Sequence, residues 1–374
     1  MIEDPSLRIC VLGAVTSAHT ITRAKIFLEY DHDVFIVTPT DQIDIDGIKI
    51  TACPRGPQSG FFHKLGWLFK VFNSVRHAKA DIFHAHYAAE LTTWMAALLG
   101  KKKLIVTVMG GDVLFDEQGS IGPVGRWLTR FALKKADLIT VKSALLADVV
   151  REFGIPSHKI VEIVWGVDHR KFKNDPIAAK NRREKWKLSQ DKKIIYSPRM
   201  LTPFYNQELM LDAFVKVQQS APESHLVFST YNEDLSFKND LIKKSKLLGI
   251  ENAISFVPAE DTNDMVGSYC AADLVLSLAP SDGTPQSVME AMACHTPVIM
   301  TDLKRYREFF KHKETAWFVK LNADDIAGSI LDLLNDTEMG CSIIEKAALN
   351  VRNIANLEAQ AELMNSYYMG LLQS

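Results

Sequence analysis

The stretch from Ala272 to Asp302 constrains the fold more than any other part of the chain. Short apolar runs at Leu274–Leu278 and Pro297–Met300 each predict a buried strand. Between them, a turn leads into Thr284-Pro285, which predicts an N-cap followed by proline at the first helical position, and then a helix over Gln286–Ala293. Two strands joined by a helical crossover form one βαβ unit, so this stretch predicts a parallel sheet.

The same alternation of short apolar runs with longer amphipathic segments continues along both halves of the chain. In the first half it predicts strands at Leu7–Gly13, Asp33–Thr38, Asp81–Tyr87, Leu104–Val108, Phe131–Thr140 and Lys159–Val164. In the second half it predicts strands at Ile194–Ser197, His225–Ser229, Ala253–Val257 and Trp317–Val319. A highly charged segment separates the halves. We therefore expect an α/β chain of two Rossmann-like, doubly wound domains, 1–168 and 191–350, with a linker and surface helix at 169–190.

Composition narrows the classes of function. At 374 residues the chain is long enough for two domains, and its formal charge of −2 argues against a nucleic-acid partner. Five scattered cysteines without a C-x-x-C pair favour a reducing compartment. The first residues lack the apolar core of a signal peptide, and no apolar stretch approaches the ~20 residues that span a bilayer. We expect a cytoplasmic protein that is soluble or at most peripheral on a membrane.

The start of the helix at Gln286 is where we expect the chemistry. Free backbone N–H groups over Gly283–Ser287 and the positive end of the helix dipole favour an anion such as phosphate. Asp282 precedes the turn and Glu290 follows within the helix, and carboxylates of this kind hold the hydroxyl groups of a sugar or ribose. Arg199 follows a predicted strand, and its planar guanidinium suits a diphosphate. An ordinary helix cap with surface acids, and a surface salt bridge at Arg199, are the alternatives.

The run from Asp282 to Val298, DGTPQSVMEAMACHTPV, resembles the signature of the family 4 retaining glycosyltransferases. In that signature an acid and a glutamate are separated by seven residues, and the glutamate opens E-A-M-A-C-G-x-P-V. The resemblance implies the GT-B fold, in which two Rossmann-like domains face each other across a cleft. It also implies that a C-terminal helix, here 351–374, returns to the first domain. The implied reaction transfers a sugar from a nucleotide-diphosphate donor and retains the anomeric configuration.

The sequence departs from the family pattern at several places. Aspartate stands at 282 where glutamate is usual, and His295 stands where glycine is usual, so that turn either tolerates a side chain or has gained a contact. Arg199 matches the arginine of G-R-x-x-x-x-K-G, but Phe204–Asn206 occupies the region of the lysine. Met109 stands where many relatives carry a histidine that contacts the donor sugar. One cation therefore does the work of two, unless another basic group enters the cleft.

The resemblance assigns roles to the residues that match. Arg199 and Asp282 are the catalytic candidates, because the departing diphosphate needs a positive charge and the sugar hydroxyls need an acceptor near the reacting carbon. Glu290 is expected to hold the ribose. The donor-binding candidates are Gly13, His19, Asn206, Gly283, Thr284, Pro285, Gln286, Ser287 and Glu290. We expect no metal site and no cofactor beyond the nucleotide-sugar substrate, with a UDP-sugar favoured over a GDP-sugar.

Candidates in the first half lie in loops after predicted strands. Gly13 allows close backbone approach to substrate, and His19 is expected to reach the donor sugar or its phosphate, with a helix-capping or merely exposed histidine as the alternative. His84 and His86 share one strand face, but no third metal ligand is evident. The resemblance suggests that His86 lines the cleft near the acceptor. Asp112 is a further acceptor-side candidate, with helix capping as the alternative.

The segment Phe61–Lys79 predicts a helix with an apolar stripe of Phe61, Leu65, Leu68, Phe72 and Val75. We expect this stripe to pack on the sheet. Trp67 and Val71 fall outside the stripe among basic residues, which suggests contact with an anionic membrane surface.

These observations favour a metal-independent glycosyltransferase of hexosyl or N-acetylhexosaminyl type. Its acceptor would be a hydroxyl of a saccharide or lipid-linked molecule in cell-envelope polysaccharide or glycoconjugate synthesis. Expected partners are the nucleotide-sugar donor, this acceptor and a membrane surface, but not nucleic acid. Two alternatives stay open: a non-catalytic nucleotide-sugar-binding subunit, which the missing lysine and histidine favour, and a GT-B nucleotide-sugar epimerase, which needs no acceptor.

Overall fold

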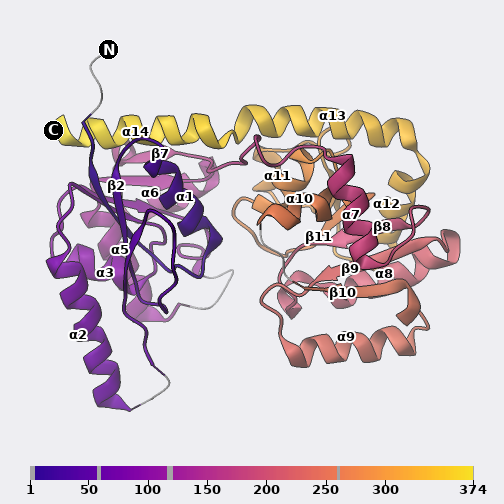
Figure 1. Cartoon of the computed structure of the whole chain (residues 1–374), viewed down its shortest axis with the longest axis horizontal. Helices are drawn as coiled ribbons and strands as arrows, with labels where there is room; N and C mark the ends of the chain where they lie inside the picture. The colour runs from indigo at the N-terminus through magenta and orange to yellow at the C-terminus, as the bar shows by residue number, and fades with distance from the viewer. Residues whose placement is uncertain (1–4, 57–59, 116–120, 259–261, 374) are drawn as a thin grey trace. The chain divides into compact units, whose positions relative to one another are not determined.

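The structure, a computed structural model of the chain, describes residues 5–56, 60–115, 121–258 and 262–373. It divides into two compact units, each with its own sheet (Figure 1). The first unit comprises Met1–Val164 with Ala359–Ser374, and the second comprises Trp165–Glu358.

The segment expected as a separate linker, 169–190, belongs to the second unit. Its helix α7 (Pro176–Trp186) packs against α10 (Thr262–Ala271). Arg183 of α7 makes an ion pair with Asp273, with Nη2 and Oδ2 2.9 Å apart, and its Nε donates to the carbonyl of Ala271. At least one of the charged residues that suggested a solvated linker, Arg183, is therefore engaged in contacts within this unit. The sequence predicted domain boundaries at 168, 191 and 350. In the structure the first unit is divided from the second after Val164 and again after Glu358.

The first unit is built on a seven-stranded parallel sheet in the order β3-β2-β1-β4-β5-β6-β7. Its strands are β1 Arg8–Leu12, β2 Asp33–Thr38, β3 Lys49–Ala52, β4 Ile82–Ala85, β5 Leu104–Thr107, β6 Leu138–Val141 and β7 Ile160–Glu162. Its helices are α1 Ala18–Leu28, α2 Phe61–His77, α3 Leu91–Leu98, α5 Pro123–Lys135, α6 Ala144–Glu152 and the greater part of α14, Leu357–Gln373. The run expected as a strand from Phe131 is helical up to Lys135, and its strand begins only at Leu138.

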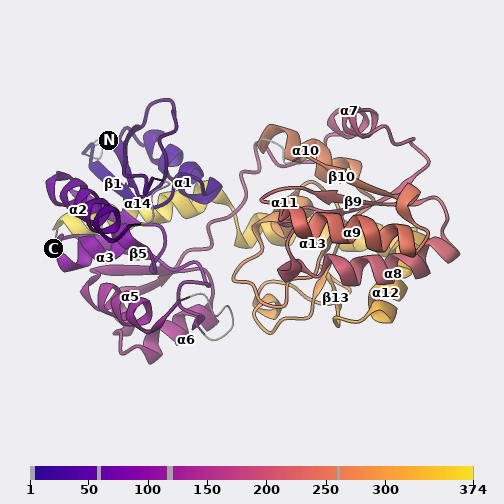
Figure 2. The same cartoon turned by 90° about the horizontal axis from the view of Figure 1, so that it is seen from below.

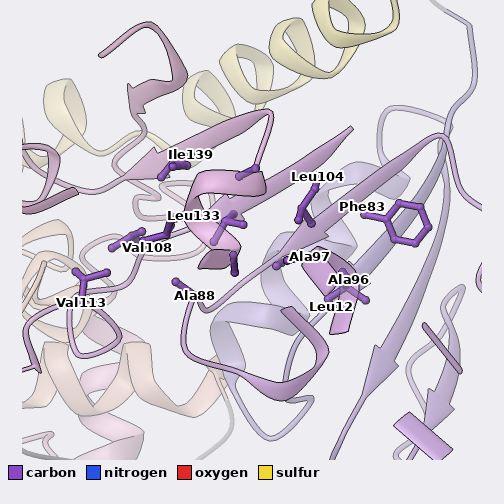
Figure 3. Packing of buried hydrophobic residues seen from close by; sticks show 14 of the residues in the cluster. Leu12, Phe83, Ala88, Ala96, Ala97, Leu104, Val108, Val113, Leu133 and Ile139 are labelled. Carbon is purple, nitrogen blue, oxygen red and sulfur yellow. The ribbon is translucent and has the colours of Figure 1, made fainter. Parts of the chain in front are cut away.

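Alternate residues of β4 face opposite sides of the sheet, as the pleat requires. Phe83 and Ala85 join the hydrophobic cluster that includes residues of α2, α3 and α5. Figure 3 shows part of this cluster, with Ala97 of α3 and Leu133 of α5 close to Leu104 of β5. His84 faces α14, where its Nδ1 lies 2.6 Å from the hydroxyl of Tyr368. Helices therefore cover both faces of the sheet.

Helix α2 presents a different face to the core from the one the sequence predicted. Val75 of the predicted stripe is buried, but Phe61 and Leu65 are 73% and 53% exposed. Trp67, expected to face outward, instead packs on the core, and its indole N–H donates to the carbonyl of Cys53 at 2.7 Å. Val71 is fully buried. Apolar residues occur all around this helix, so their spacing alone could not identify the core face. Within the described ranges, no helix is both long and apolar enough to cross a bilayer.

The second unit has a six-stranded parallel sheet in the order β10-β9-β8-β11-β12-β13. Its strands are β8 Lys193–Ser197, β9 Ser224–Ser229, β10 Ile254–Val257, β11 Leu274–Ser277, β12 Val298–Thr301 and β13 Trp317–Val319. Besides α7 and α10, its helices are α8 Gln207–Ser220, α9 Leu235–Leu247, α11 Gln286–Ala293, α12 Ala323–Asn335 and α13 Thr337–Ile354. The predicted doubly wound α/β architecture is confirmed in both units.

Each sheet has a point where the strand order reverses. In the first unit the reversal lies between β1 and β4, and in the second it lies between β8 and β11. At such a point the connections leave toward opposite faces, so the loops after the two strands diverge and leave room for a ligand. Gly13 follows β1 and His86 follows β4, while Arg199 follows β8 and Asp282 follows β11. The topology therefore places the candidates of each half at its switch point.

Candidate functional site

The loop after β11 and the first turn of α11 form the centre of the candidate site. Helix α11 begins at Gln286, as predicted, but Pro285 takes the N-cap position and the expected Thr284 cap bond is not formed. The first N–H groups of a helix have no carbonyl within it to bond. In the described part of the chain, the backbone N–H groups of Gly283, Thr284, Gln286 and Ser287 also find no acceptor elsewhere. This helix start therefore offers several donors to an anion.

Arg199 contacts both sides of this turn. Its Nη2 lies 2.7 Å from Oδ2 of Asp282, and its Nη1 lies 3.3 Å from the hydroxyl of Ser287. Its guanidinium also lies over the ring of Tyr205, 4.6 Å from the ring centre. Burial lowers the pKa of Arg199, but the charge of Asp282 more than offsets this and leaves the pKa above its usual value. The cation is therefore permanent, and the structure brings Arg199, Asp282 and Ser287 together.

Two further side chains, which the sequence analysis missed, hold the same turn. The hydroxyl of Tyr306, a fully buried residue, lies 3.1 Å from Oδ2 of Asp282 and donates to it. Arg305 donates from Nε to the carbonyl of Asp282 at 2.7 Å and from Nη2 to the hydroxyl of Ser281 at 3.0 Å. Both residues follow β12, the neighbour of β11 in the sheet. That position was the available signal, because loops after adjacent parallel strands meet at one edge.

Glu290 lies one turn into α11. Its carboxylate accepts a hydrogen bond from the hydroxyl of Tyr269, which is 3.0 Å away and fully buried on α10. Burial raises the pKa of Glu290 to about 7, although the hydrogen bonds from Tyr269 and Gln286 oppose the shift. The side-chain amide of Gln286 also donates to the carbonyl of Gly166 at 2.8 Å. Gln286 therefore ties the first turn of α11 to the segment that begins this unit.

Four buried hydroxyl groups lie at the carboxyl ends of the strands around this loop. Ser197, Ser277 and Thr301 are the last residues of β8, β11 and β12, and Thr284 lies in the loop itself. All four are less than 8% exposed, and their hydroxyl oxygens have no hydrogen-bond partner among the described residues. Buried polar groups are normally paired, so unpaired ones at one edge of a sheet mark it as a place for a polar ligand.

Tyr205 and Asn206, in the region where the family carries a lysine, make contacts that hold the site together. Tyr205 is buried beneath Arg199, and Asn206 adopts the left-handed conformation with φ of 58°. The side-chain amide of Asn206 donates to the carbonyl of Leu278 at 2.7 Å, just beyond the end of β11. Asn206 is thus brought to the site, where it holds the backbone. The second cation of this region is Arg305.

His295, which replaces the family's glycine, also has a left-handed backbone, with φ of 60°. Its Nδ1 lies 3.5 Å from a carboxylate oxygen of Glu345, whose side chain is 75% exposed. The turn has therefore both tolerated a side chain and gained a contact.

In the first unit the structure brings Gly13 and His86 together at the switch point. A Cβ atom added at Gly13 would lie 3.4 Å from Cβ of His86 and 3.3 Å from Oγ1 of Thr20, so a side chain there would crowd Thr20. His86 is 4% exposed, and its backbone N–H donates to the carbonyl of Leu12. His19 lies in the first turn of α1, but its side chain falls outside the described part of the structure.

His84 is engaged on both ring nitrogens. Nδ1 lies 2.6 Å from the Tyr368 hydroxyl and Nε2 lies 2.7 Å from Oγ1 of Thr107. Burial, together with the charge of Arg23, lowers the pKa of His84 to about 3, so the ring is neutral. His84 and His86 therefore do not form a metal pair. In the described ranges, no group of three or more His, Cys, Asp or Glu side chains is arranged to hold a metal ion.

Asp112 organises the loop after β5. Its Oδ1 accepts the backbone N–H groups of Met109 and Gly110, and its Oδ2 accepts that of Ala88 at 2.7 Å. The side chain is fully buried, and burial raises its pKa although these hydrogen bonds oppose the shift. Asp112 thus joins the loops after β4 and β5, and among the described residues its carboxylate accepts no hydrogen bond from the first turn of a helix. Any effect on the acceptor would act through these loops.

The sequence analysis did not single out Glu90 or Arg23, which lie near these residues in the first unit. Glu90, at the start of α3, has a pKa that burial raises to about 7, although a hydrogen bond from the backbone of Ala14 opposes the shift. Met109 presents its sulfur 3.4 Å from both Nη atoms of Arg23, which is buried and whose pKa burial lowers to about 9. The position expected for a donor-contacting histidine is thus filled by a thioether facing a guanidinium.

Comparison with known proteins identifies the family. The sequence model for Glycosyltransferase Family 4 matches residues 13–171, and the model for Glycosyl transferases group 1 matches residues 179–349. Together they cover nearly the whole chain. The chain belongs to the group 1, or family 4, glycosyltransferases.

Individual relatives of this glycosyltransferase are distant. N-acetyl-alpha-D-glucosaminyl L-malate synthase of Bacillus anthracis is 24% identical over 288 residues, which are 75% of this chain and 72% of that protein. The crystal structure of Anabaena Alr3699/HepE in complex with UDP and glucose superposes with a TM-score of 0.82 at 16% identity, covering 96% of this chain and 99% of that one. WaaG, a glycosyltransferase involved in lipopolysaccharide biosynthesis, gives a TM-score of 0.77 at 12% identity, covering 97% and 100%. These structures confirm the GT-B fold.

Proposed function

We propose that this glycosyltransferase moves a hexosyl or N-acetylhexosaminyl group from a UDP-sugar to a hydroxyl of a saccharide or lipid-linked acceptor, with retention of configuration. The observation that carries the proposal is the contact of Arg199 with both Asp282 and Ser287 at the open start of α11. It joins a permanent cation, a carboxylate and free backbone N–H groups in one place. A sugar attached to a diphosphate needs this combination.

Each group has a role in this reaction. The N–H groups at the start of α11 and the guanidinium of Arg199 bind the diphosphate and stabilise the negative charge that develops as it departs. Asp282 accepts hydrogen bonds from sugar hydroxyls near the anomeric carbon. Glu290 accepts them from the ribose. Since Arg199 is paired with Asp282 before donor binds, the diphosphate must share or replace this partner.

We propose that the reaction needs no metal ion and no cofactor. Arg199 and Arg305 both contact Asp282, one at its carboxylate and one at its carbonyl. Two guanidinium groups beside the helix start provide the positive charge that the diphosphate requires. Arg305 thereby supplies the charge of the missing lysine.

The choice of donor and acceptor rests on the relatives. The HepE structure contains UDP and glucose, which supports a UDP-sugar here. WaaG acts in lipopolysaccharide biosynthesis, which supports an envelope saccharide or a lipid-linked acceptor. We therefore place the activity in cell-envelope polysaccharide or glycoconjugate synthesis, close to a membrane surface.

A non-catalytic nucleotide-sugar-binding subunit is the second candidate. The burial of Tyr205 where the family carries a lysine, and the Met109–Arg23 contact where it carries a histidine, both favour it. An epimerase would share the donor site and turn over without an acceptor.

One assay separates these functions. The purified full chain is incubated with UDP- and GDP-sugars, with and without saccharide or lipid-linked acceptors, and released nucleotide is measured. A transferase releases UDP only when a suitable acceptor is present, and Asp282→Ala abolishes the release. Release without acceptor indicates hydrolysis of the donor. An epimerase keeps the nucleotide attached, so it is detected by chromatography as conversion of the donor into its sugar epimer. Nucleotide binding measured by calorimetry, with neither release nor epimer formed under any pairing, would identify the binding subunit and contradict the proposal.

A further inference from the structure

Helix α2 carries four large apolar side chains that are exposed to solvent. Phe61, Phe62, Leu65 and Phe69 are 73%, 82%, 53% and 64% exposed. Only Val71 and Val75 of its seventeen residues are buried, both in its second half. In Figure 1 the first turns of α2 extend beyond the rest of this unit. Single exposed apolar residues are ordinary, but a contiguous group of four large ones marks an interaction surface.

The exposed group continues onto the helices beside α2. Helix α3 packs against both α2 and α5, and Figure 2 shows the three next to one another. All three contribute to one hydrophobic cluster beneath them. Leu98 at the end of α3 is 51% exposed, and Val124 and Trp127 of α5 are 72% and 61% exposed. Leu65, Leu68, Phe69 and Phe72 of α2 line an open groove together with Met95 of α3.

The charge of these three helices has one sign. None of the residues in Phe61–His77, Leu91–Leu98 or Pro123–Lys135 is Asp or Glu. The same segments carry Lys64, Lys70, Arg76, Arg126, Arg130, Lys134 and Lys135, and the turn after α3 adds Lys101, Lys102 and Lys103. The whole chain has a net charge of −2, so acids are concentrated elsewhere. The surface formed by these three helices, none of which contains Asp or Glu, is hereafter the basic face.

We propose that the basic face docks on an anionic lipid bilayer, with the four exposed apolar side chains of α2 inserted among the headgroups. An amphipathic helix with basic residues around large apolar side chains binds at this depth, and each Lys or Arg near an anionic leaflet adds to the attraction. A second copy of the chain is a poorer occupant, because two basic faces repel each other.

The residues that insert differ from those the sequence suggested. Trp67 is held against the core by its hydrogen bond to Cys53 and is not available to a membrane. Phe62 and Phe69 take its place. Bilayer binding involves none of the donor-site residues, so it does not depend on the proposed function. Only the link to a lipid-linked acceptor rests on that function.

Co-sedimentation with vesicles tests the proposal. The full chain is mixed, without donor or acceptor, with vesicles of phosphatidylcholine alone or of phosphatidylcholine with phosphatidylglycerol. We expect binding to the mixed vesicles only, weakening steeply with salt. The double variant Phe62→Ser/Phe69→Ser and the double variant Lys64→Glu/Lys70→Glu should each bind at least about tenfold more weakly. These side chains are exposed, so circular dichroism should show both variants folded.

Matched controls come from the second unit. Leu247 on α9 is 88% exposed, and the side chain of Lys243 is 74% exposed. The double variant Lys243→Glu/Leu247→Ser should bind vesicles as the original chain does. Equal binding by all variants, or no binding by the original chain, overturns the proposal. So does a dimer that the Phe variant abolishes while vesicle binding is absent. Because no nucleotide is present, an inactive donor site cannot cause any of these results.

Discussion

The Nη2 atom of Arg199 lies 2.7 Å from Oδ2 of Asp282, and both side chains are largely buried. These are the two residues at the switch point of the second sheet, and they come from neighbouring strands that are far apart in sequence. The ion pair holds the Asp282 carboxylate and the Arg199 guanidinium in place beside the helix start without substrate. A donor therefore enters a site whose charged groups are already oriented, which reduces the reorganisation needed at the moment of reaction.

Replacing Arg199 by alanine should slow transfer strongly. Loss of a preorganised charge at a departing group costs ~2–4 kcal/mol, or between about thirtyfold and a thousandfold in kcat. Arg199→Lys should recover part of the rate, because an ammonium keeps the charge but cannot bridge Asp282 and Ser287. Steady-state kinetics with saturating acceptor measures this. Arg307→Ala is the control. Arg307 is exposed and forms an ion pair with Asp302, so its loss should leave kcat unchanged.

Replacing Tyr306 by phenylalanine should destabilise the second unit. Its hydroxyl is fully buried and bonds the Asp282 carboxylate at 3.1 Å, and a hydrogen bond to a charged group contributes ~1.5–3 kcal/mol. Urea unfolding of the Tyr306→Phe variant and of the original chain gives the change in the free energy of unfolding. Tyr231→Phe, at a ring that is 42% exposed, should change it little. A loss below ~0.5 kcal/mol would show that Arg199 alone suffices to hold Asp282.

The titration of Glu290 should appear in the pH dependence of stability. Its pKa is about 7 in the folded protein against 4.5 for a free side chain. The folded state therefore keeps a proton that the unfolded state loses, and the stabilisation present below pH 4.5 is lost as the pH rises through 7. Glu290→Gln cannot titrate, so its stability relative to the original protein should increase across this window. Unfolding free energies measured at successive pH values provide the test.

Glu90 titrates in the same range and acts equally in both proteins, so the difference between them isolates Glu290. The same titration governs donor binding if Glu290 holds the ribose. Affinity for UDP should then rise as the pH increases through about 7 in the original protein and stay flat in the variant. A rise of equal size in both would remove Glu290 from the ribose site.

Replacing His295 by glycine should stabilise the protein slightly. A side chain in the left-handed conformation costs ~1 kcal/mol or more relative to glycine, although histidine tolerates it better than most residues. The contact with the exposed Glu345 contributes at most ~1 kcal/mol. We expect a net gain of about 0.5 kcal/mol for His295→Gly. His295→Ala keeps the strained backbone and loses the contact, so it should be less stable than the original. Thermal unfolding of the three proteins distinguishes these outcomes.

The architecture was readable from the sequence because buried parallel strands are short apolar runs. Asp33–Thr38, Gln286–Ala293 and Trp317–Val319 have the predicted bounds. Where a helix is apolar all around, the pattern loses its information. Helix α2 turned a different face inward, and the apolar start of Phe131–Thr140 proved to be the last turn of α5. Strand β3 was missed because Lys49–Ala52 is only partly buried at the sheet edge.

The candidate site was readable where one local motif carries it. Asp282, Ser287 and Glu290 lie on one strand–turn–helix, and Arg199 follows the strand beside it. Arg305, Tyr306 and Tyr269 could not be found in this way, because they reach the turn from separate elements through tertiary contacts. Their placement needed the strand order, which spacing along the chain does not contain.

The unpaired hydroxyls at the ends of β8, β11 and β12 set a trade-off for this protein. Each hydroxyl is buried without a hydrogen-bond partner among the described residues, so alanine at Ser197 or Ser277 should make the second unit more stable. Selection for durability alone would remove them. A thermostable version of this enzyme obtained by such substitutions would be improved as a scaffold and weakened as a catalyst.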